Sequence, residues 1–285
     1  MRSIKFFIGY AVAILLIVVV ITINAVCSIA QFEVTVTGSS FGEERAADIQ
    51  AALDEEFGGK SYLFFRENSV YDVVAKKGDG YLEVESVEKH FPNKITVSLS
   101  EKYEVFAFLN ETDGKYYVVG DDRTVLAVKE DNANNIDGTN IVITGIGFEA
   151  QSAGDASVVG ETFAVFPEFE DEYESLWTLF EQFSGQGMWH NIVSIDYDDT
   201  GLNDPTYDFN YFYIDTVEGV HVWLENPGSR MEEKAKLALQ TYEGLTEAQR
   251  TFGYINVIEV GYPQPTGELS ASYSTDEPPL SAENK

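Results

Sequence analysis

The chain has 285 residues, which is enough for about two domains. Its 48 acidic and 18 basic side chains give a formal charge of -30, and this excludes DNA and RNA as partners because their phosphates would be repelled. The single cysteine, Cys27, excludes a disulfide framework and a paired-thiol centre for metal or redox chemistry.

The N-terminal segment predicts a membrane anchor. Arg2 and Lys5 precede an uncharged apolar run, and about 20 apolar residues suffice to cross the hydrocarbon core as a helix. Because both cations precede the run, we expect residues 1–5 in the cytoplasm, a transmembrane helix over 6–30 and all later residues outside. A signal peptide cleaved after Ala30 is the alternative, although the apolar part of such peptides is usually only about 7 to 15 residues long.

Residues 31–102 predict a small unit of two helices and three strands. Its elements, in chain order, are a strand with Phe32, Val34 and Val36 on one face, a helix that ends at Gly58, a second helix behind Asn68, and strands over residues 81–91 and 95–99. Two helices can cover one face of a three-stranded sheet, so we expect a compact β-α-α-β-β unit.

Residues 103–273 predict a larger β-rich unit with a mixed sheet and two or so helices, which makes the expected fold class α+β. Apolar stripes at helical spacing predict helices over residues 169–183 and from about 231 to 242. The predicted strands cover residues 105–109, 115–119, 124–128, 191–197, 211–215, 220–224, 254–262 and 268–273. Residues 274–285 have no apolar period and predict a disordered acidic tail.

Short motifs along the chain carry a family resemblance. They lie at residues 34–38 (VTVTG), 62–65 (YLFF), 87–101 (VEKHFPNKITVSLSE), 116–119 (YYVV), 143–145 (ITG), 231–237 (MEEKAKL) and 254–262 (YINVIEVGY). In this order, and behind an N-terminal anchor, they resemble the FtsQ/DivIB family of bacterial division proteins. The sequence departs from the family pattern at residues 102–104, where the family usually has R-x-P, and at Gly120 and Arg123, which replace an Asp and a Gly.

The resemblance implies a function without enzymatic activity, cofactor or metal. Residues 31–102 would form a POTRA domain and residues 103–273 the β domain of a single-pass protein of the bacterial cell membrane, located at the division septum. Such a protein is a divisome scaffold that binds bitopic coiled-coil proteins of the FtsL/DivIC/FtsB type. It also helps to assemble and regulate septal peptidoglycan synthesis by FtsW/FtsI-type enzymes.

The last strands are the partner-binding segment that the resemblance implies. A strand at a sheet edge offers unpaired N–H and C=O groups to an incoming strand, and aromatic side chains are frequent interface anchors. The candidate partner-binding residues are Val257, Ile258, Val260, Tyr262 and Tyr273. The alternative for the two tyrosines is that they pack only on their own sheet.

Gly38-Ser39-Ser40-Phe41-Gly42 matches the G-x-S-x-G motif of serine hydrolases. That chemistry needs an oxyanion loop from an earlier strand–helix unit, and only one strand and the apolar segment precede Ser40. We instead expect Ser40 and Glu43 to form a capping box at the start of the first helix after residue 37.

Two further alternatives stay open. Residues 196–207 begin like a calcium-binding loop, with Asp196, Asp198 and Gly201 in the expected places, but Tyr207 stands where the bidentate glutamate is needed. An acidic turn exposed to solvent is therefore the preferred interpretation. For the whole chain, the alternative function is an anchored or secreted acidic domain that binds the cell wall or a surface, without enzymatic activity.

Overall fold

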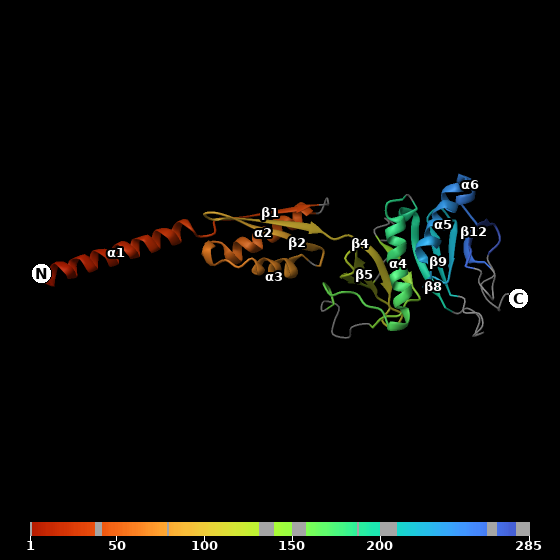
Figure 1. Cartoon of the computed structure of the whole chain (residues 1–285), viewed down its shortest axis with the longest axis horizontal. Coiled ribbons are helices and arrows are strands. Elements are labelled where there is room, and N and C mark those ends of the chain that lie inside the picture. The colour runs from red at the N-terminus through yellow and green to blue at the C-terminus, as the bar shows by residue number, and fades with distance from the viewer. Residues whose placement is uncertain are drawn as a thin grey trace. The chain divides into compact units, whose positions relative to one another are not determined.

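The computed structural model describes residues 2–37, 42–78, 80–130, 140–149, 158–186, 188–199, 210–260 and 267–277. The chain divides into two compact units, Met1–Lys102 and Tyr103–Lys285, each with its own hydrophobic core. Figure 1 labels the elements of both units. The fold is α+β, with six α-helices and two separate sheets in the described residues.

The transmembrane helix expected over residues 6–30 is wrong. No helix within the described part of the chain combines the length and the apolar character needed to cross a membrane. Helix α1 is Arg2–Val26. The end of the expected span is also misplaced, because Cys27 and Ile29 are buried in the core of unit 1.

After α1, unit 1 forms a three-stranded sheet with helices α2 and α3. Its elements are β1 (Gln31–Thr37), α2 (Gly42–Phe57), the 3-10 helix η1 (Tyr62–Phe64), α3 (Asn68–Lys77), β2 (Leu82–His90) and β3 (Lys94–Glu101). The strands lie in the order β1-β3-β2, with β1 parallel and β2 antiparallel to β3. The predicted β-α-α-β-β order is confirmed, and the parallel pair exists because the intervening helices allow a crossover.

The core of unit 1 lies between its sheet and helices α2 and α3. Phe32 of β1, Ile49 of α2 and Val70 of α3 are all fully buried there. The ring of Phe32 also meets the ring of Phe65 edge to face at a centroid distance of 5.6 Å, a favourable arrangement for two aromatic rings. These contacts join both helices and the segment after η1 to a single sheet face.

Unit 2 is built on one nine-stranded mixed sheet in the order β12-β11-β10-β9-β8-β7-β4-β5-β6. Its strands are β4 (Glu104–Leu109), β5 (Tyr116–Gly120), β6 (Val125–Lys129), β7 (Ile141–Thr144), β8 (Ile192–Asp198), β9 (Tyr211–Thr216), β10 (His221–Glu225), β11 (Tyr254–Glu259) and β12 (Leu269–Ser274). Its helices are η4 (Pro167–Phe169), α4 (Glu170–Phe183), η5 (Trp189–Asn191), α5 (Met231–Gly244) and α6 (Glu247–Arg250).

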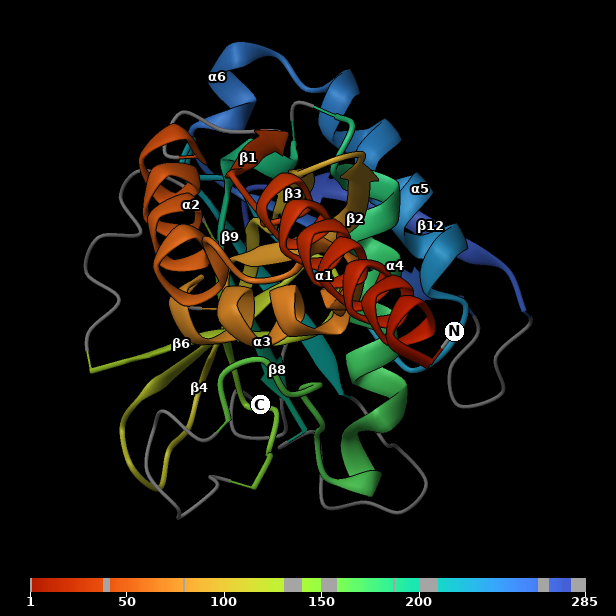
Figure 2. The same cartoon turned by 90° about the vertical axis from the view of Figure 1, so that its left-hand side faces the viewer.

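Helices α4 and α5 pack against each other and share one core with the sheet. Figure 2 shows the two helices together at one side of the strands. The Trp177 ring of α4 meets Phe106 of β4 edge to face at 5.1 Å, and Ala235 and Ala238 bring α5 close to the sheet because they are small and fully buried. Helix α5 contacts β11 and β12, so it supports the end of the sheet where the chain finishes.

Candidate docking edge

Strand β12 forms one outer edge of the nine-stranded sheet. It pairs with β11 in antiparallel register, from Leu269 opposite Glu259 to Ser274 opposite Tyr254. Within the described residues, no strand pairs with its other side. Its sequence, LSASYS, contains neither a charged residue nor a proline. Proteins usually protect exposed edges with lysine, proline or a bulge, so β12 is an edge open to strand addition.

The opposite edge of the same sheet, β6, is bonded to a neighbouring segment at its first residue. The N–H of Val125 in β6 donates to the carbonyl oxygen of Glu161 at 2.9 Å, and the N–H of Gly160 donates to the carbonyl oxygen of Val125 at 2.8 Å. A further bridge joins Thr124 to Thr162 just before β6. The two edges therefore differ within the described residues, because a segment of the chain itself bonds the start of β6 while no strand pairs with the outer side of β12.

One hydrogen bond fixes which groups of β12 face outward. Just beyond the paired residues, the N–H of Val260 donates to the carbonyl oxygen of Glu268 at 2.8 Å. Hydrogen-bonded pairs alternate with non-bonded pairs along an antiparallel ladder. The backbone N–H and C=O groups of Leu269, Ala271 and Tyr273 consequently point away from β11, toward the free side.

The side chains of β12 divide between the two faces of the sheet. Ala271 and Tyr273 pack against the core on the helix side, and the Tyr273 hydroxyl donates to the carbonyl oxygen of Phe252 at 3.1 Å. The other face carries three serines, Ser270, Ser272 and Ser274. The side chains of β12 therefore project to the two faces of the sheet, and the backbone groups alone face the position of an added strand.

The structure separates the predicted partner-binding residues. Val257 is fully buried in β11, which is an interior strand between β10 and β12, and Ile258 beside it is half-buried. Val260 lies just after β11, Tyr273 lies in β12, and Tyr262 is outside the described residues. Of these five residues, Tyr273 is therefore the one placed on the edge strand itself.

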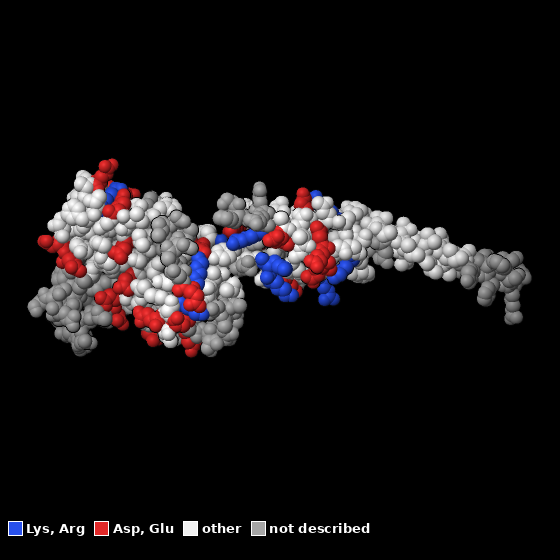
Figure 3. Space-filling view, turned by 180° about the vertical axis from the view of Figure 1, so that it is seen from behind, with Lys and Arg blue, Asp and Glu red and all other residues white. Residues whose placement is uncertain are grey.

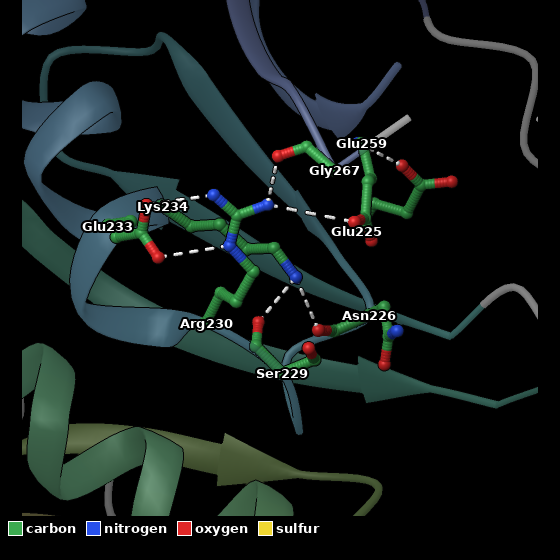
Figure 4. Close-up of polar contacts among 8 residues, drawn as sticks. All are labelled: Glu225, Asn226, Ser229, Arg230, Glu233, Lys234, Glu259 and Gly267. Carbon is green, nitrogen blue, oxygen red and sulfur yellow. Dashed lines mark hydrogen bonds and ion pairs between the residues drawn. The ribbon is translucent and has the colours of Figure 1, made fainter. Parts of the chain in front are cut away.

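A polar cluster holds the two ends of the β11–β12 connection. It consists of Glu225, Arg230, Glu233, Lys234 and Glu259, and Figure 4 shows these side chains converging where α5 begins. We call this group the hairpin cluster. Its members come from the end of β10, the first turn of α5 and the end of β11.

Arg230 is the centre of the exposed part of the hairpin cluster. Its guanidinium makes two bonds to the carboxylate of Glu233, at 2.9 and 2.8 Å, and lies 3.6 Å from the carboxylate of Glu259. It also donates to the carbonyl oxygen of Gly267 at 2.6 Å, two residues before β12 (Figure 4). Arg230 thus links the start of α5 to both ends of the connection that presents β12.

Glu225 and Lys234 form the buried part of the hairpin cluster. Lys234 is fully buried and donates to the carbonyl oxygens of Asn226 and Ser229 at 2.7 and 2.5 Å (Figure 4). Glu225 is also buried and accepts the backbone N–H of Glu259 at 2.8 Å, which joins β10 to β11 beyond their ladder.

Burial governs the pKa values of this pair. It lowers the pKa of Lys234 to about 8, against the opposing effect of the carboxylates of Glu259 and Glu225. It raises the pKa of Glu225, against the opposing effect of the Glu259 N–H and the Lys234 charge. Both shifts have the direction expected when a charged group leaves water.

Sequence reasoning missed the hairpin cluster, although one signal was present. Met231, Ala235, Ala238 and Tyr242 form the buried stripe of α5, and Lys234 falls on that stripe. A lysine at a core position of a helix is rarely tolerated without hydrogen-bonding partners, so it indicates a buried polar site. Arg230 gave no comparable signal, because its role depends on the distant residues Glu259 and Gly267.

The serine motif cannot be evaluated in the structure. Residues 38–41 are outside the described residues, together with the proposed capping contact of Ser40, and α2 begins at Gly42. The three histidines belong to three different elements, with His90 at the end of β2 in unit 1, and His190 in η5 and His221 in β10 of unit 2. Among the described residues, no group of three His, Cys, Asp or Glu side chains is arranged to hold a metal ion.

The possible calcium loop also differs from the expected arrangement. Asp196 and Asp198 lie within β8 and pair with Tyr213 and Tyr211 of β9. Asp196 accepts a hydrogen bond from the Thr144 hydroxyl. Residues 200–209, which would complete the loop, are outside the described residues. The first two carboxylates therefore belong to a paired strand and not to a loop.

Comparison with known proteins leaves the family assignment open. No protein-family model matches the sequence. No curated protein gives a significant match either.

Proposed function

We propose that this chain is a non-catalytic docking protein of bacterial cell division. In this proposal, the free side of β12 receives a β-strand from a bitopic coiled-coil protein of the FtsL/DivIC/FtsB type. The bound partner would connect the chain to septal peptidoglycan synthesis by FtsW/FtsI-type enzymes. The division septum is accordingly the expected location.

The observation that carries the proposal is the contrast between the two sheet edges. β6 is paired at its first residue, Val125, with residues 160 and 161 of the same chain, whereas β12 has no charge, no proline and a free side within the described residues. An unprotected edge risks uncontrolled pairing, so its retention is best explained by a partner that occupies it. Strand addition supplies affinity through main-chain hydrogen bonds and specificity through alternate side chains.

The contacts of α5 and Arg230 with β12 and its connection also favour a docking role for this strand. α5 packs against β12, and Arg230 links the start of α5 to Gly267 and Glu259 at the two ends of the connection. An edge held in one position before binding loses less conformational entropy when a partner pairs with it. The family resemblance of the sequence motifs supplies the class of partner.

A substitution at the edge tests this proposal. Ala271→Pro removes an outward N–H, while Ala271→Ser at the same position keeps it. The full-length chain is mixed with purified candidate coiled-coil partners, and binding is measured by co-purification and by hydrogen exchange. We expect the partner to bind the native chain and Ala271→Ser, to slow exchange at Leu269, Ala271 and Tyr273, and to lose at least tenfold in affinity for Ala271→Pro.

Equal affinity of the proline and serine variants would exclude strand addition at β12. A cellular measurement tests the wider role, since a fluorescent fusion should gather at the septum and depletion should impair septation. Uniform staining of the cell wall with normal septation would favour the alternative of a wall-binding or adhesive domain.

A further inference from the structure

Unit 1 exposes a small group of large apolar side chains. Leu63, Phe64 and Phe91 keep 54%, 83% and 75% of their surface in contact with solvent. Leu63 and Phe64 belong to η1, and Phe91 lies in the turn between β2 and β3. We call these three side chains the apolar patch. Exposed apolar groups that gather in one place usually mark a binding surface.

The two segments of the apolar patch are held together by direct contacts. The ring of Tyr62 meets the ring of Phe91 at a centroid distance of 6.4 Å. The ammonium group of Lys89, near the end of β2, donates to the carbonyl oxygen of Phe65 at 2.6 Å. These contacts connect η1 to the β2–β3 turn, so the three exposed side chains belong to one ordered region.

The apolar patch adjoins the end of helix α1. The N–H of Tyr62 donates to the carbonyl oxygen of Cys27 at 2.7 Å, and the N–H of Ala30 donates to that of Asn93 at 2.9 Å. α1 ends at Val26, so the first residues after the helix are bonded to both segments that carry the patch. The patch therefore lies beside the C-terminal end of α1.

Exposed apolar side chains also lie on every side of the middle of α1, over residues 14–21. Eight consecutive residues are apolar and between 43% and 63% exposed: Ile14, Leu15, Leu16, Ile17, Val18, Val19, Val20 and Ile21. A partner protein usually covers one stripe of a helix, which leaves a polar stripe facing water. The exposed apolar residues of α1 extend the apolar surface of unit 1 beyond the patch, and lipid can cover such a surface without a complementary polar stripe.

We propose that the apolar patch binds the interfacial region of a lipid bilayer. The patch combines exposed aromatic rings with flanking cations, Lys60 and Arg66, as interfacial binding surfaces do. The proposal concerns contact with the bilayer surface and requires no helix to cross it.

The distribution of charge agrees with this assignment. Unit 1 has 10 basic and 14 acidic side chains, net -4, whereas unit 2 has 8 basic and 34 acidic side chains, net -26. Figure 3 shows lysine and arginine side chains on unit 1 and many carboxylates across unit 2. Anionic headgroups would repel unit 2 much more strongly than unit 1, so lipid contact is expected through unit 1.

Site-specific fluorescence quenching in the full chain tests the proposal. Single cysteines replace Phe64 or Phe91 in a Cys27→Ala background and carry a small fluorescent dye. Controls carry the same dye at Glu83, which is exposed and lies about 25 Å from Phe91 along β2, or at Phe252 in unit 2, which is 51% exposed. Each labelled protein is mixed with phosphatidylcholine vesicles that contain nitroxide-labelled lipid.

We expect quenching at positions 64 and 91 to exceed that at positions 83 and 252 by at least threefold. Quenching of the same strength at Glu83, or none at either patch position, would overturn the proposal. Circular dichroism confirms that each labelled variant is folded before quenching is compared. The test is independent of the docking function, because neither the partner nor β12 takes part in it.

Discussion

The backbone N–H of Val260 donates to the carbonyl oxygen of Glu268. This contact fixes, for each later residue of β12, whether its backbone N–H and C=O groups face β11 or the free side. Ala271 presents its N–H to the free side, while the N–H of its neighbour Ser272 is directed at Asn256 of β11. The N–H groups of these two adjacent residues therefore point in opposite directions, one away from the sheet and one toward β11.

Proline substitutions should distinguish these two neighbours. Ala271→Pro removes no hydrogen bond of the sheet, so we expect it to lower the free energy of unfolding by at most about 1 kcal/mol. Ser272→Pro removes a ladder bond and leaves a carbonyl group of β11 unpaired, so the loss should be about 2 kcal/mol larger. Urea unfolding of both variants measures the difference, and equal losses would show that the deduced alternation is wrong.

Glu225 should stabilise the β10–β11 junction through the backbone of Glu259. Glu225→Ala removes the acceptor for that N–H and the carboxylate near Lys234, so we expect a loss of about 2 kcal/mol in the free energy of unfolding. Glu225→Gln keeps an oxygen that can accept the bond and should lose about half as much. The measurement is the shift of the urea midpoint at constant m-value, and an alanine variant as stable as the native chain would contradict this role.

The lowered pKa of Lys234 predicts a pH-dependent stability. The unfolded chain holds the lysine proton up to its ordinary pKa of 10.5, whereas the folded chain releases it at about 8. The unfolded state then binds more protons between these values, so this contribution to folding stability rises as the pH increases. Below the folded pKa both states are protonated and the contribution no longer changes.

Lys234→Met isolates this effect because it removes the titrating group and keeps most of the volume. We expect the free energy of unfolding of the native chain, relative to Lys234→Met, to increase by about 2 kcal/mol between about pH 8 and about pH 10. Chemical unfolding at several pH values gives the difference between the two proteins, which cancels the titration of the tyrosines they share. A difference that stays flat over this range would exclude the shifted lysine.

Two glycines with similar backbone angles offer a test of close packing. Gly145 and Gly160 have φ values of 78° and 88°, where any other residue is strained. A Cβ at Gly145 would overlap the backbone carbonyl of Tyr197 in β8, whereas a Cβ at Gly160 would meet nothing within 4 Å.

Gly160→Ala should therefore cost about 1 to 2 kcal/mol from backbone strain alone. Gly145→Ala adds a steric conflict between β7 and β8 and should cost at least about 3 kcal/mol in total. Thermal and urea unfolding of the two variants provide the comparison. If the two alanine variants were equally stable, the close approach of the chain at Gly145 would be refuted.

Local patterns predicted the individual elements well. Ile95, Val97 and Leu99 alternate with polar residues in the sequence, and all three are fully buried on one face of β3. Side-chain direction in a strand alternates with period two, so the pattern can be recognised without knowing any neighbour. The apolar stripes of α4 and α5 could also be recognised locally, because apolar residues recur at helical spacing along one face of a helix.

The order of strands could not be predicted in this way. β11 and β12 were both expected to contribute to docking, yet Val257 of β11 is fully buried and the strand has a neighbour on each side. Which strand is outermost depends on pairings between residues far apart in the chain, such as the parallel pairing of β10 with β11 across α5. Such pairings leave little trace in a local pattern.

The N-terminal prediction failed where the apolar run enters the folded unit. Cys27 and Ile29 continue the apolar composition of α1, but they are buried in the core of unit 1 and bonded to Lys60, Tyr62 and neighbouring segments. Composition alone does not distinguish an apolar residue that faces lipid from one that packs in a core.

The asymmetry between β6 and β12 also limits what the molecule can assemble into. A sheet with two open edges can add copies of itself at both ends and grow into a fibre. Because Val125 at the start of β6 is already bonded to residues 160 and 161, a strand added along that edge would have to displace them, and β12 is the favoured end for addition. Two copies paired through β12 would form a closed dimer that consumes both free edges, and a bound partner strand would prevent even that. The sheet therefore favours a stoichiometry of one partner strand per chain and terminates any self-association after a single step.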